Sequence, residues 1–150
     1  MAGMAALGRM FDVITNASGV YFSLKNCSGV TFVCQASGAS SVALTCATAF
    51  SGGTTSTYTT AHGFGQAGYW YQNTSDTGTA AWVKETAVWT TNSIALAQTT
   101  GYVSVFEVLV SQLADTYDYI AATGTNTGVI AILHDLTVQR NPANLQILGV

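Results

Sequence analysis

Alternation of apolar and polar residues with a period of two is the feature of this sequence that most limits its fold. Val42, Leu44 and Cys46 alternate with small or polar residues, and larger apolar residues of one parity recur from Ile130 to Val138. Such alternation is typical of strands that bury one face. The sequence therefore predicts a chain built mainly from half-buried strands.

Short segments rich in Gly, Asn, Ser and Thr separate the candidate strands, as expected for turns. We expect strands near residues 11–15, 20–25, 30–35, 42–49, 68–73, 80–90, 93–98, 102–110, 116–122 and 128–139. The turn signals lie at 16–19, 26–29, 37–41, 73–78, 99–101 and 123–128. This spacing predicts an all-β fold, an antiparallel β-sandwich of jelly-roll or immunoglobulin-like type with little helix.

A chain of 150 residues fits one domain. We expect the sandwich over residues 11–139, an N-terminal arm or short helix over 1–10, and a C-terminal arm over 140–150. Residues 111–115 would form at most a single helical turn. The segment 51–60 has low complexity and no charge, so we expect a surface loop or a solvated edge strand. Because residues 1–10 lack a charged region before their apolar stretch, we do not expect a signal peptide.

Charged residues are scarce and limit the classes of partner. The chain has four basic and seven acidic residues, 7% in all, against about 25% in an average soluble domain. Scattered basic residues cannot neutralise phosphates, so we expect neither nucleic-acid binding nor attraction to an anionic membrane. No apolar run approaches the length of a transmembrane helix. Such a chain stays soluble by burying apolar surface against other subunits or by carrying a Thr- and Ser-rich surface.

The three cysteines, Cys27, Cys34 and Cys46, do not make a complete disulfide framework because their number is odd. A bridge between Cys27 and Cys34 across a hairpin remains one alternative. The other is that all three are buried thiols that pack as small apolar side chains. Their spacing lacks the paired pattern of zinc sites, so we expect no metal.

Phosphate-binding and catalytic motifs are weak. The run Gly63–Gly68 matches G-x-G-x-x-G, but an aromatic segment typical of a strand follows it, so we interpret it as a loop and expect no cofactor. His62 lies in the same loop. His134 and Asp135 are adjacent, so on one strand they would point to opposite sides and form no dyad. No Ser-His-Asp arrangement is evident, and we expect no enzyme activity.

Glu107 is the outlier among the acidic residues, because it interrupts the apolar segment 102–110. That segment is apolar on both parities, which favours a central strand covered on both faces. Glu107 would then be either a buried anchor paired with a basic residue or a solvent-facing residue at an edge.

Aromatic residues gather around one predicted hairpin and allow two interpretations. An exposed set would form a platform for stacking sugars, as in carbohydrate-binding modules, whereas aromatic residues on strands more often pack in the core or in an interface. The candidates are Tyr69, Trp70, Tyr71, Trp82 and Trp89.

A possible tyrosine corner lies just after the apolar segment 102–110. Leu113, Asp115 and Tyr119 have the spacing of this motif, in which the tyrosine hydroxyl bonds back to the backbone and fixes the crossing between two sheets. The Cys-Trp-Cys framework of immunoglobulin domains is missing. The motif therefore supports a sandwich rather than an immunoglobulin domain.

The C-terminal third carries a resemblance to a known family. Its elements are Leu113-Ala-Asp115, Tyr117-Asp-Tyr119 and the run from Ala131-Ile-Leu133-His134-Asp135 through Arg140-Asn-Pro142-Ala-Asn144-Leu145, with Ala6-Leu-Gly-Arg9 and Gly29-Val-Thr-Phe32 towards the N-terminus. These segments resemble small virion proteins of tailed bacteriophages. The resemblance spans most of the chain and is dense over its last third.

The resemblance implies a head decoration (cement) protein, located on the capsid surface of the virion. Its partners would be the major capsid protein, at junctions between capsomers, and other copies of itself, most plausibly in a homotrimer. No catalytic residues come with the family. The arms would supply contacts with the shell and neighbouring subunits, and the candidate residues are Met4, Leu7, Arg9, Arg140, Pro142, Leu145, Ile147 and Leu148. A tail, neck or head-fibre component and a carbohydrate-binding module remain the alternatives.

Overall fold

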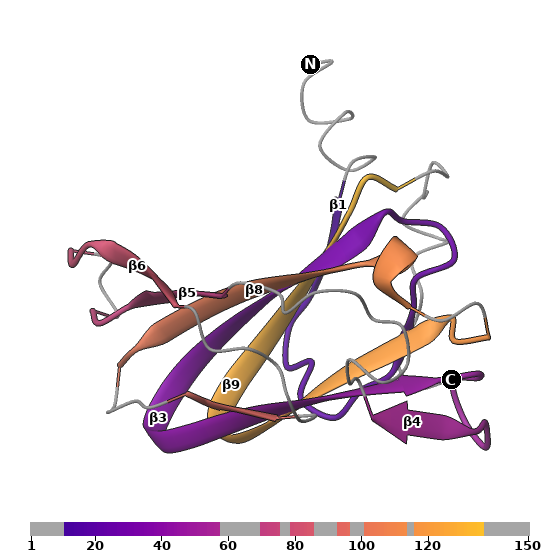
Figure 1. Cartoon of the computed structure of the whole chain (residues 1–150), viewed down its shortest axis with the longest axis horizontal. Helices are drawn as coiled ribbons and strands as arrows, with labels where there is room; N and C mark the ends of the chain where they lie inside the picture. Colours follow the sequence, from indigo (N-terminus) through magenta and orange to yellow (C-terminus); the bar gives the residue numbers. More distant parts are fainter. Residues whose placement is uncertain are drawn as a thin grey trace.

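The chain folds into antiparallel β-structure, as the alternation predicted (Figure 1). The computed structural model describes residues 11–57, 70–75, 79–85, 93–96, 101–113 and 116–136. Within them the strands are β1 (Phe11–Ile14), β2 (Phe22–Ser23), β3 (Gly29–Ala47), β4 (Thr55–Thr57), β5 (Trp70–Asn73), β6 (Trp82–Glu85), β7 (Ser93–Leu96), β8 (Val103–Leu109) and β9 (Tyr119–His134). One short 3-10 helix, η2 (Val110–Gln112), follows β8, close to the predicted single turn. No helix among these residues is long and apolar enough to cross a membrane.

All these strands belong to one sheet, and its path through the described strands is open. Its main path runs β1-β9-β3-β8-β5-β6, and β2, β4 and β7 pair with β9 or β3 beside this path. The named strands pair antiparallel throughout. The expectation of an all-β, antiparallel, sandwich-like fold is therefore confirmed.

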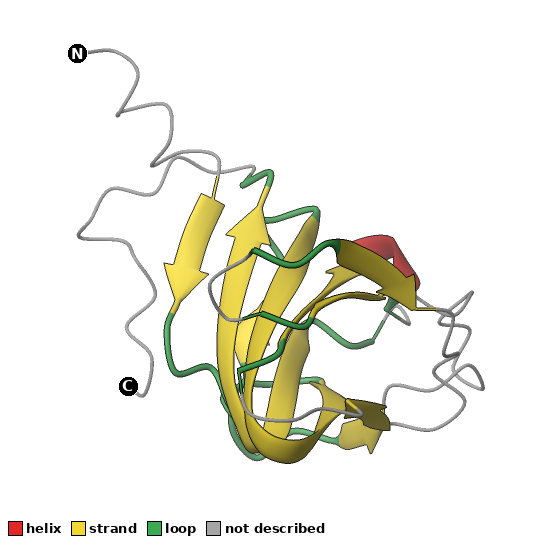
Figure 2. Ribbon diagram, turned by 90° about the vertical axis from the view of Figure 1, so that its left-hand side faces the viewer, coloured by secondary structure: helices red, strands yellow, loops and turns green. Residues whose placement is uncertain are grey.

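The sheet becomes a sandwich because its two longest strands bend together. β3 pairs with β9 first over residues 29–36 and then, after a register shift between Ala36 and Ser41, over residues 41–47. Figures 1 and 2 show both strands curving back at the same end of the molecule. The shorter strands then join one half of the pair or the other.

This bend corrects the predicted turns at 37–41 and 123–128. Neither segment interrupts its strand; the two lie opposite each other and form a corner of the paired strands. The Asn126 side-chain amide donates to the Ala39 carbonyl at 3.1 Å, and the Ser37 hydroxyl donates to the Asn126 carbonyl at 3.0 Å. Bulges and small residues allow strands to bend in this way. The same residue types that make a turn in a single strand make a corner in a pair.

The core lies between the two halves of the bent pair. One half contributes Val30, Phe32 and Cys34 from β3, and the other half contributes buried residues from the same strand beyond the corner, Val42, Leu44 and Cys46. The ring centroid of Phe32 lies 5.2 Å from that of Phe106 on β8 and 5.9 Å from that of Phe22 on β2. The contact between Phe32 and Phe22 connects the two halves, because Phe22 pairs with Ile120 in the half of β9 before the corner, whereas Phe106 is the register partner of Phe32 in the same half.

The cysteines follow the simpler of the two interpretations, because all three are buried and none forms a disulfide. Burial raises the pKa of Cys34 and of Cys46 to about 12, since the thiolate would lose its hydration there. The described part of segment 51–60 agrees with the prediction of a solvated edge strand: Thr55–Thr57 forms β4, which pairs with β3 and is largely exposed.

Of the tyrosine-corner residues, Leu113 is buried and Tyr119 begins β9 opposite Ala47, whereas Asp115 lies outside the described residues. The arms at 1–10 and 140–150, with all eight contact candidates named above, also lie outside them, as do His62 and Gly63–Gly68.

Candidate functional site

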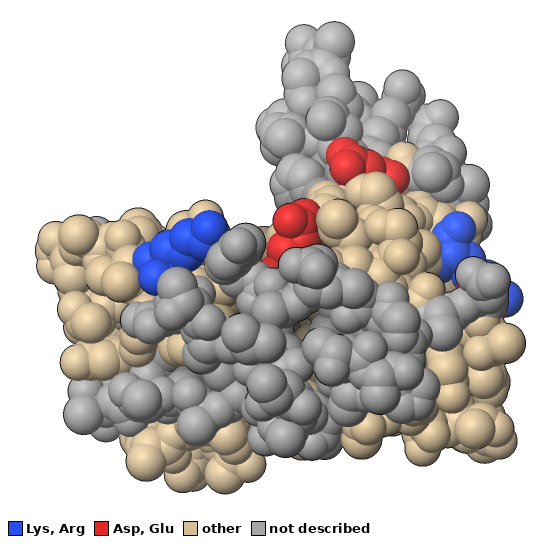
Figure 3. All heavy atoms as spheres, in the orientation of Figure 1, with Lys and Arg blue, Asp and Glu red and all other residues tan. Residues whose placement is uncertain are grey.

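One face of the main sheet points away from the core and carries apolar side chains. We call it the outer face. The alternation that buries Val30 and Phe32 turns their neighbours Thr31 and Val33 outward. The residues of the outer face are Val13, Thr31, Val33, Tyr71, Val103, Val105, Glu107, Leu109, Ile130 and Ile132. Figure 3 shows how few charged side chains the described surface carries in that view, and how far apart they lie.

The strand register arranges these side chains in rows across the sheet. Ile130 lies opposite Val33, Val33 opposite Val105, and Val105 opposite Tyr71, so one apolar row crosses four strands. We call this the central row. Tyr71 and Ile130, at its two ends, are 46% and 39% exposed, and Val13 on β1 is 46% exposed. Large apolar side chains therefore meet solvent at both ends of the central row, and Val33 and Val105 between them are half-buried.

This exposure corrects the expectation that segment 102–110 is covered on both faces. β8 does lie between two other strands, β3 and β5, and its residues Ser104, Phe106 and Val108 are buried. Its other face is open, with Glu107 and Leu109 exposed. Apolar residues on both parities thus belong to a strand with one face in the core and the other half-buried to exposed.

Two shallow hollows lie on the outer face on either side of the central pair Val33 and Val105. The first, of about 430 Å³, lies over β8 and β5 and is lined by Thr31, Tyr71, Val105, Phe106, Glu107, Leu109 and Gln112. The second, of about 460 Å³, lies towards β1 and β9 and is lined by Thr15, Asn16, Val33, Gln35, Val103, Gly128, Val129 and Ile130. The outer face is thus corrugated, with hollows separated by the central row.

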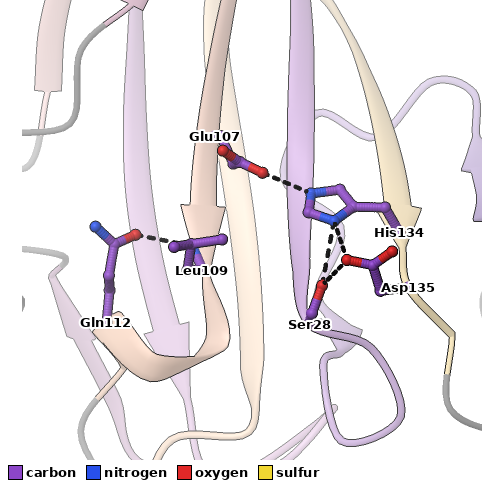
Figure 4. A network of polar contacts seen from close by, with 6 residues as sticks. All are labelled: Ser28, Glu107, Leu109, Gln112, His134 and Asp135. Atoms are coloured by element: carbon purple, nitrogen blue, oxygen red, sulfur yellow. Dashed lines mark hydrogen bonds and ion pairs between the residues drawn. The ribbon is translucent and has the colours of Figure 1, made fainter.

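A polar cluster marks one end of the outer face (Figure 4). The Nε2 atom of His134, at the end of β9, lies 3.0 Å from a Glu107 carboxylate oxygen on β8. The Nδ1 atom lies 3.3 Å from the Ser28 hydroxyl oxygen and 3.7 Å from an Asp135 carboxylate oxygen. The Ser28 hydroxyl donates to that same Asp135 oxygen at 2.6 Å. Glu107 therefore faces a histidine from a strand two places away, rather than an Arg or a Lys.

Gly29 makes the contact between His134 and Glu107 sterically possible. It lies on β3 between its partners His134 on β9 and Leu109 on β8. A Cβ atom at this position would meet the Val108 carbonyl oxygen at 2.8 Å and the His134 ring at 2.9 Å. Because glycine has no side chain, the imidazole ring lies over β3 and reaches β8.

The structure corrects the expectation that His134 and Asp135 point apart. β9 ends at His134, and Asp135 has a φ of +51°, outside the extended conformation that would alternate the two side chains. Ser28 joins them across 106 residues of sequence, which no local motif signals. Adjacent residues share a side of the backbone here because the strand stops between them.

The chemistry of this cluster favours a role in holding Asp135 in place over a role in nucleophilic attack. In a Ser-His-acid triad the serine proton goes to the imidazole. Here the one hydroxyl proton of Ser28 goes to Asp135, so Ser28 presents a lone pair to His134. The Nε2 atom of His134 lies 3.0 Å from the Glu107 carboxylate without an aligned hydrogen bond. The cluster instead fixes Asp135 and hence the direction in which the chain leaves β9.

The aromatic candidates separate into buried and exposed members. Trp70 is only 4% exposed, so it belongs to the core and cannot stack on a sugar. Trp82 on β6 is 51% exposed, and the register turns it towards the same side as Tyr71. Tyr69 and Trp89 lie outside the described residues.

Within the described ranges no group of three or more His, Cys, Asp and Glu side chains is placed to hold a metal ion. No protein-family model, curated protein or solved structure matches the chain. The physical features of the outer face and of the polar cluster are therefore the basis for an account of function.

Proposed function

We propose that this protein is a structural component of a tailed-phage virion that decorates and stabilises the capsid by binding the major capsid protein where capsomers meet. The observation that carries the proposal is the exposed, nearly uncharged apolar outer face on a sheet whose other side already has a packed core, since a protein that assembles on a shell buries such a face against the shell or against another copy of itself. Exposed apolar patches on a folded domain mark interaction sites. The sequence resemblance to small virion proteins supplies the kind of assembly.

The positions at which the chain enters and leaves the sheet also support this role. β1 begins at Phe11, directly opposite His134. Asp135 follows His134 and accepts a hydrogen bond from the Ser28 hydroxyl. The chain therefore enters β1 and leaves β9 at the same end of the main sheet. Contacts made from that end suit a protein that binds a shell through one end of its body.

Immunogold labelling of intact virions, with mass spectrometry of the same purified particles, tests the proposal. We expect the protein among the virion proteins and the label on the head. Label on the tail, neck or head fibres would support the alternative virion location instead. Absence of the protein from purified virions would overturn any virion role.

One observation favours a second candidate, a carbohydrate-binding module. Tyr71 and Trp82 are both exposed on neighbouring strands and face the same side, as a sugar-stacking platform requires. A glycan array with the wild-type protein and the variant Trp82→Ala tests it. Binding that the variant loses supports this function, and the absence of binding by the wild type rejects it.

A further inference from the structure

We propose that the outer face pairs two copies of this chain face to face, about a two-fold axis that runs along the central row. This inference goes beyond the decorating role, because the contact forms between two copies of the chain and needs no shell. It commits to a second copy as the occupant of the outer face. The argument rests on the size of the face, on its relief and on the position of its charge.

The size of the outer face fits one partner of this chain's own kind. It covers five strands, β1, β9, β3, β8 and β5, and about seven residues along each of the longer ones. With four residues on each of β1 and β5, at about 4.8 Å between strands and about 3.3 Å per residue, that is roughly 460 Å² in flat projection. The accessible area of a corrugated surface is larger, so the face approaches the ~800 Å² per partner of a standard interface.

The relief of the face is self-complementary about this axis. A two-fold axis within an interface brings each residue on the axis next to the same residue of the other copy. A residue beside the axis meets the residue of the other copy that lies at the same distance on the opposite side of the axis. Val13 lies one row to one side of the central row, and the second hollow lies on the other side. The exposed Val13 side chain of each copy would therefore enter the second hollow of the other.

The same two-fold rotation gives Trp82 a contact in the dimer, whereas in a single copy this residue is 51% exposed. Its register partner is Asn73, which lies opposite Val103, one row from the central row on the side away from Glu107. The axis brings Trp82 of one copy beside the first hollow of the other, the one that Glu107 and Tyr71 line. Each exposed side chain thus meets a hollow, as close packing between two faces requires.

The charges on and beside the face lie away from its middle. Lys84 on β6 lies opposite Tyr71 at one end of the central row, so the axis brings its two copies near each other at the exposed rim, where salt screens them. Glu107 is two residues from Val105 along β8, so the axis puts the two Glu107 side chains about 13 Å apart, beyond a Debye length at physiological salt. Within each copy, His134 lies 3.0 Å from the same carboxylate. The middle of the interface is left to uncharged side chains, as in the buried centre of protein interfaces.

Analytical ultracentrifugation of the purified full-length chain tests the pairing. We expect twice the mass of one chain for the wild type. The variant Ile130→Asp should raise the dissociation constant at least about tenfold, because it puts a charge on the central row. The matched control is Val83→Asp, since Val83 is 51% exposed and its register turns it away from the outer face. It should leave the dimer intact.

Cysteine cross-linking tests the axis with little perturbation of the fold. Val105 lies on the central row, and facing sheets lie about 10 Å apart, so a short bifunctional maleimide should join two copies of Val105→Cys but not two copies of Val83→Cys. The three native cysteines are buried and should not interfere. A monomeric or trimeric wild type, an unaffected Ile130→Asp dimer, or equal cross-linking of the two cysteine variants would overturn the inference. A monomer that still labels phage heads overturns the pairing alone, and a dimer absent from virions overturns the decorating role alone.

Discussion

At the scale of single residues, Gly29 leaves the space in which His134 on β9 reaches Glu107 on β8 across β3. The variant Gly29→Ala should lower the free energy of unfolding by about 1–3 kcal/mol, because the new methyl group meets backbone and the imidazole ring at under 3.0 Å. Urea denaturation measures the loss. The matched control is Gly38→Ala, whose Cβ would meet nothing within 4 Å. Equal stabilities of the two variants would contradict the role given to Gly29.

The buried thiols of Cys34 and Cys46 make the stability depend on pH above neutrality. In the folded chain their pKa values are raised to about 12, whereas an exposed thiol titrates near 9. The unfolded chain therefore releases these protons first, and stability is complete below about pH 9 and falls as the pH rises towards 12. Each thiol should remove up to about 1.4 kcal/mol per pH unit in that window.

Urea denaturation at several pH values from about 7 to about 11 measures this dependence. The variant Cys46→Ala should be less stable at neutral pH, because it leaves a small cavity, yet lose less stability as the pH rises. A variant with the same pH slope as the wild type would show that this thiol does not titrate differently in the folded chain.

At the scale of elements, the corner of β3 and β9 depends on Asn126, whose φ of +50° is unusual for a residue with a side chain. The variant Asn126→Val should lower the free energy of unfolding by about 1–3 kcal/mol, because a β-branched residue is strained there and the bond to the Ala39 carbonyl is lost. Asn126→Gly should cost less, since glycine accepts this conformation. Thermal unfolding gives the order, with Thr125→Val, at an exposed neighbouring strand position, as the control.

Local patterns predict the strands but not the corner that joins them. Period-two alternation located the second half of β3 and the end of β9, and an apolar run located β8. On β9 the alternation did not show which face is buried, because Ile130 lies on the outer face and the smaller Ala131 lies in the core. The turn signals at 37–41 and 123–128 could not show that they pair with each other, since that contact spans more than 80 residues of sequence. Their composition is the same whether the chain reverses or a pair of strands bends.

The polar cluster was only partly visible in the sequence for the same reason. Glu107 stands out as an acid within an apolar strand, and His134 stands out as one of two histidines. Ser28 does not, because its role depends on the pairing of Gly29 with His134. The scarcity of charge predicted that the chain has an apolar surface. It could not show which residues form the outer face, because they are brought together by the register of five strands.

At the scale of the whole molecule, the scarcity of charge predicts how self-association responds to salt. The outer face carries one carboxylate, Glu107, which lies against His134 of the same chain, so pairing should depend on buried apolar area rather than on ion pairs between copies. Raising NaCl from about 0.05 M to about 1 M should change the dimer dissociation constant less than about threefold, because few charges are there to be screened.

Ammonium sulfate should tighten the dimer, since sulfate favours the burial of apolar surface. Sedimentation equilibrium at each salt concentration measures both effects, with Ile130→Asp as the variant that stays dissociated. Weakening by more than about tenfold in NaCl would show that ion pairs hold the copies together, which the charges of the described surface do not provide.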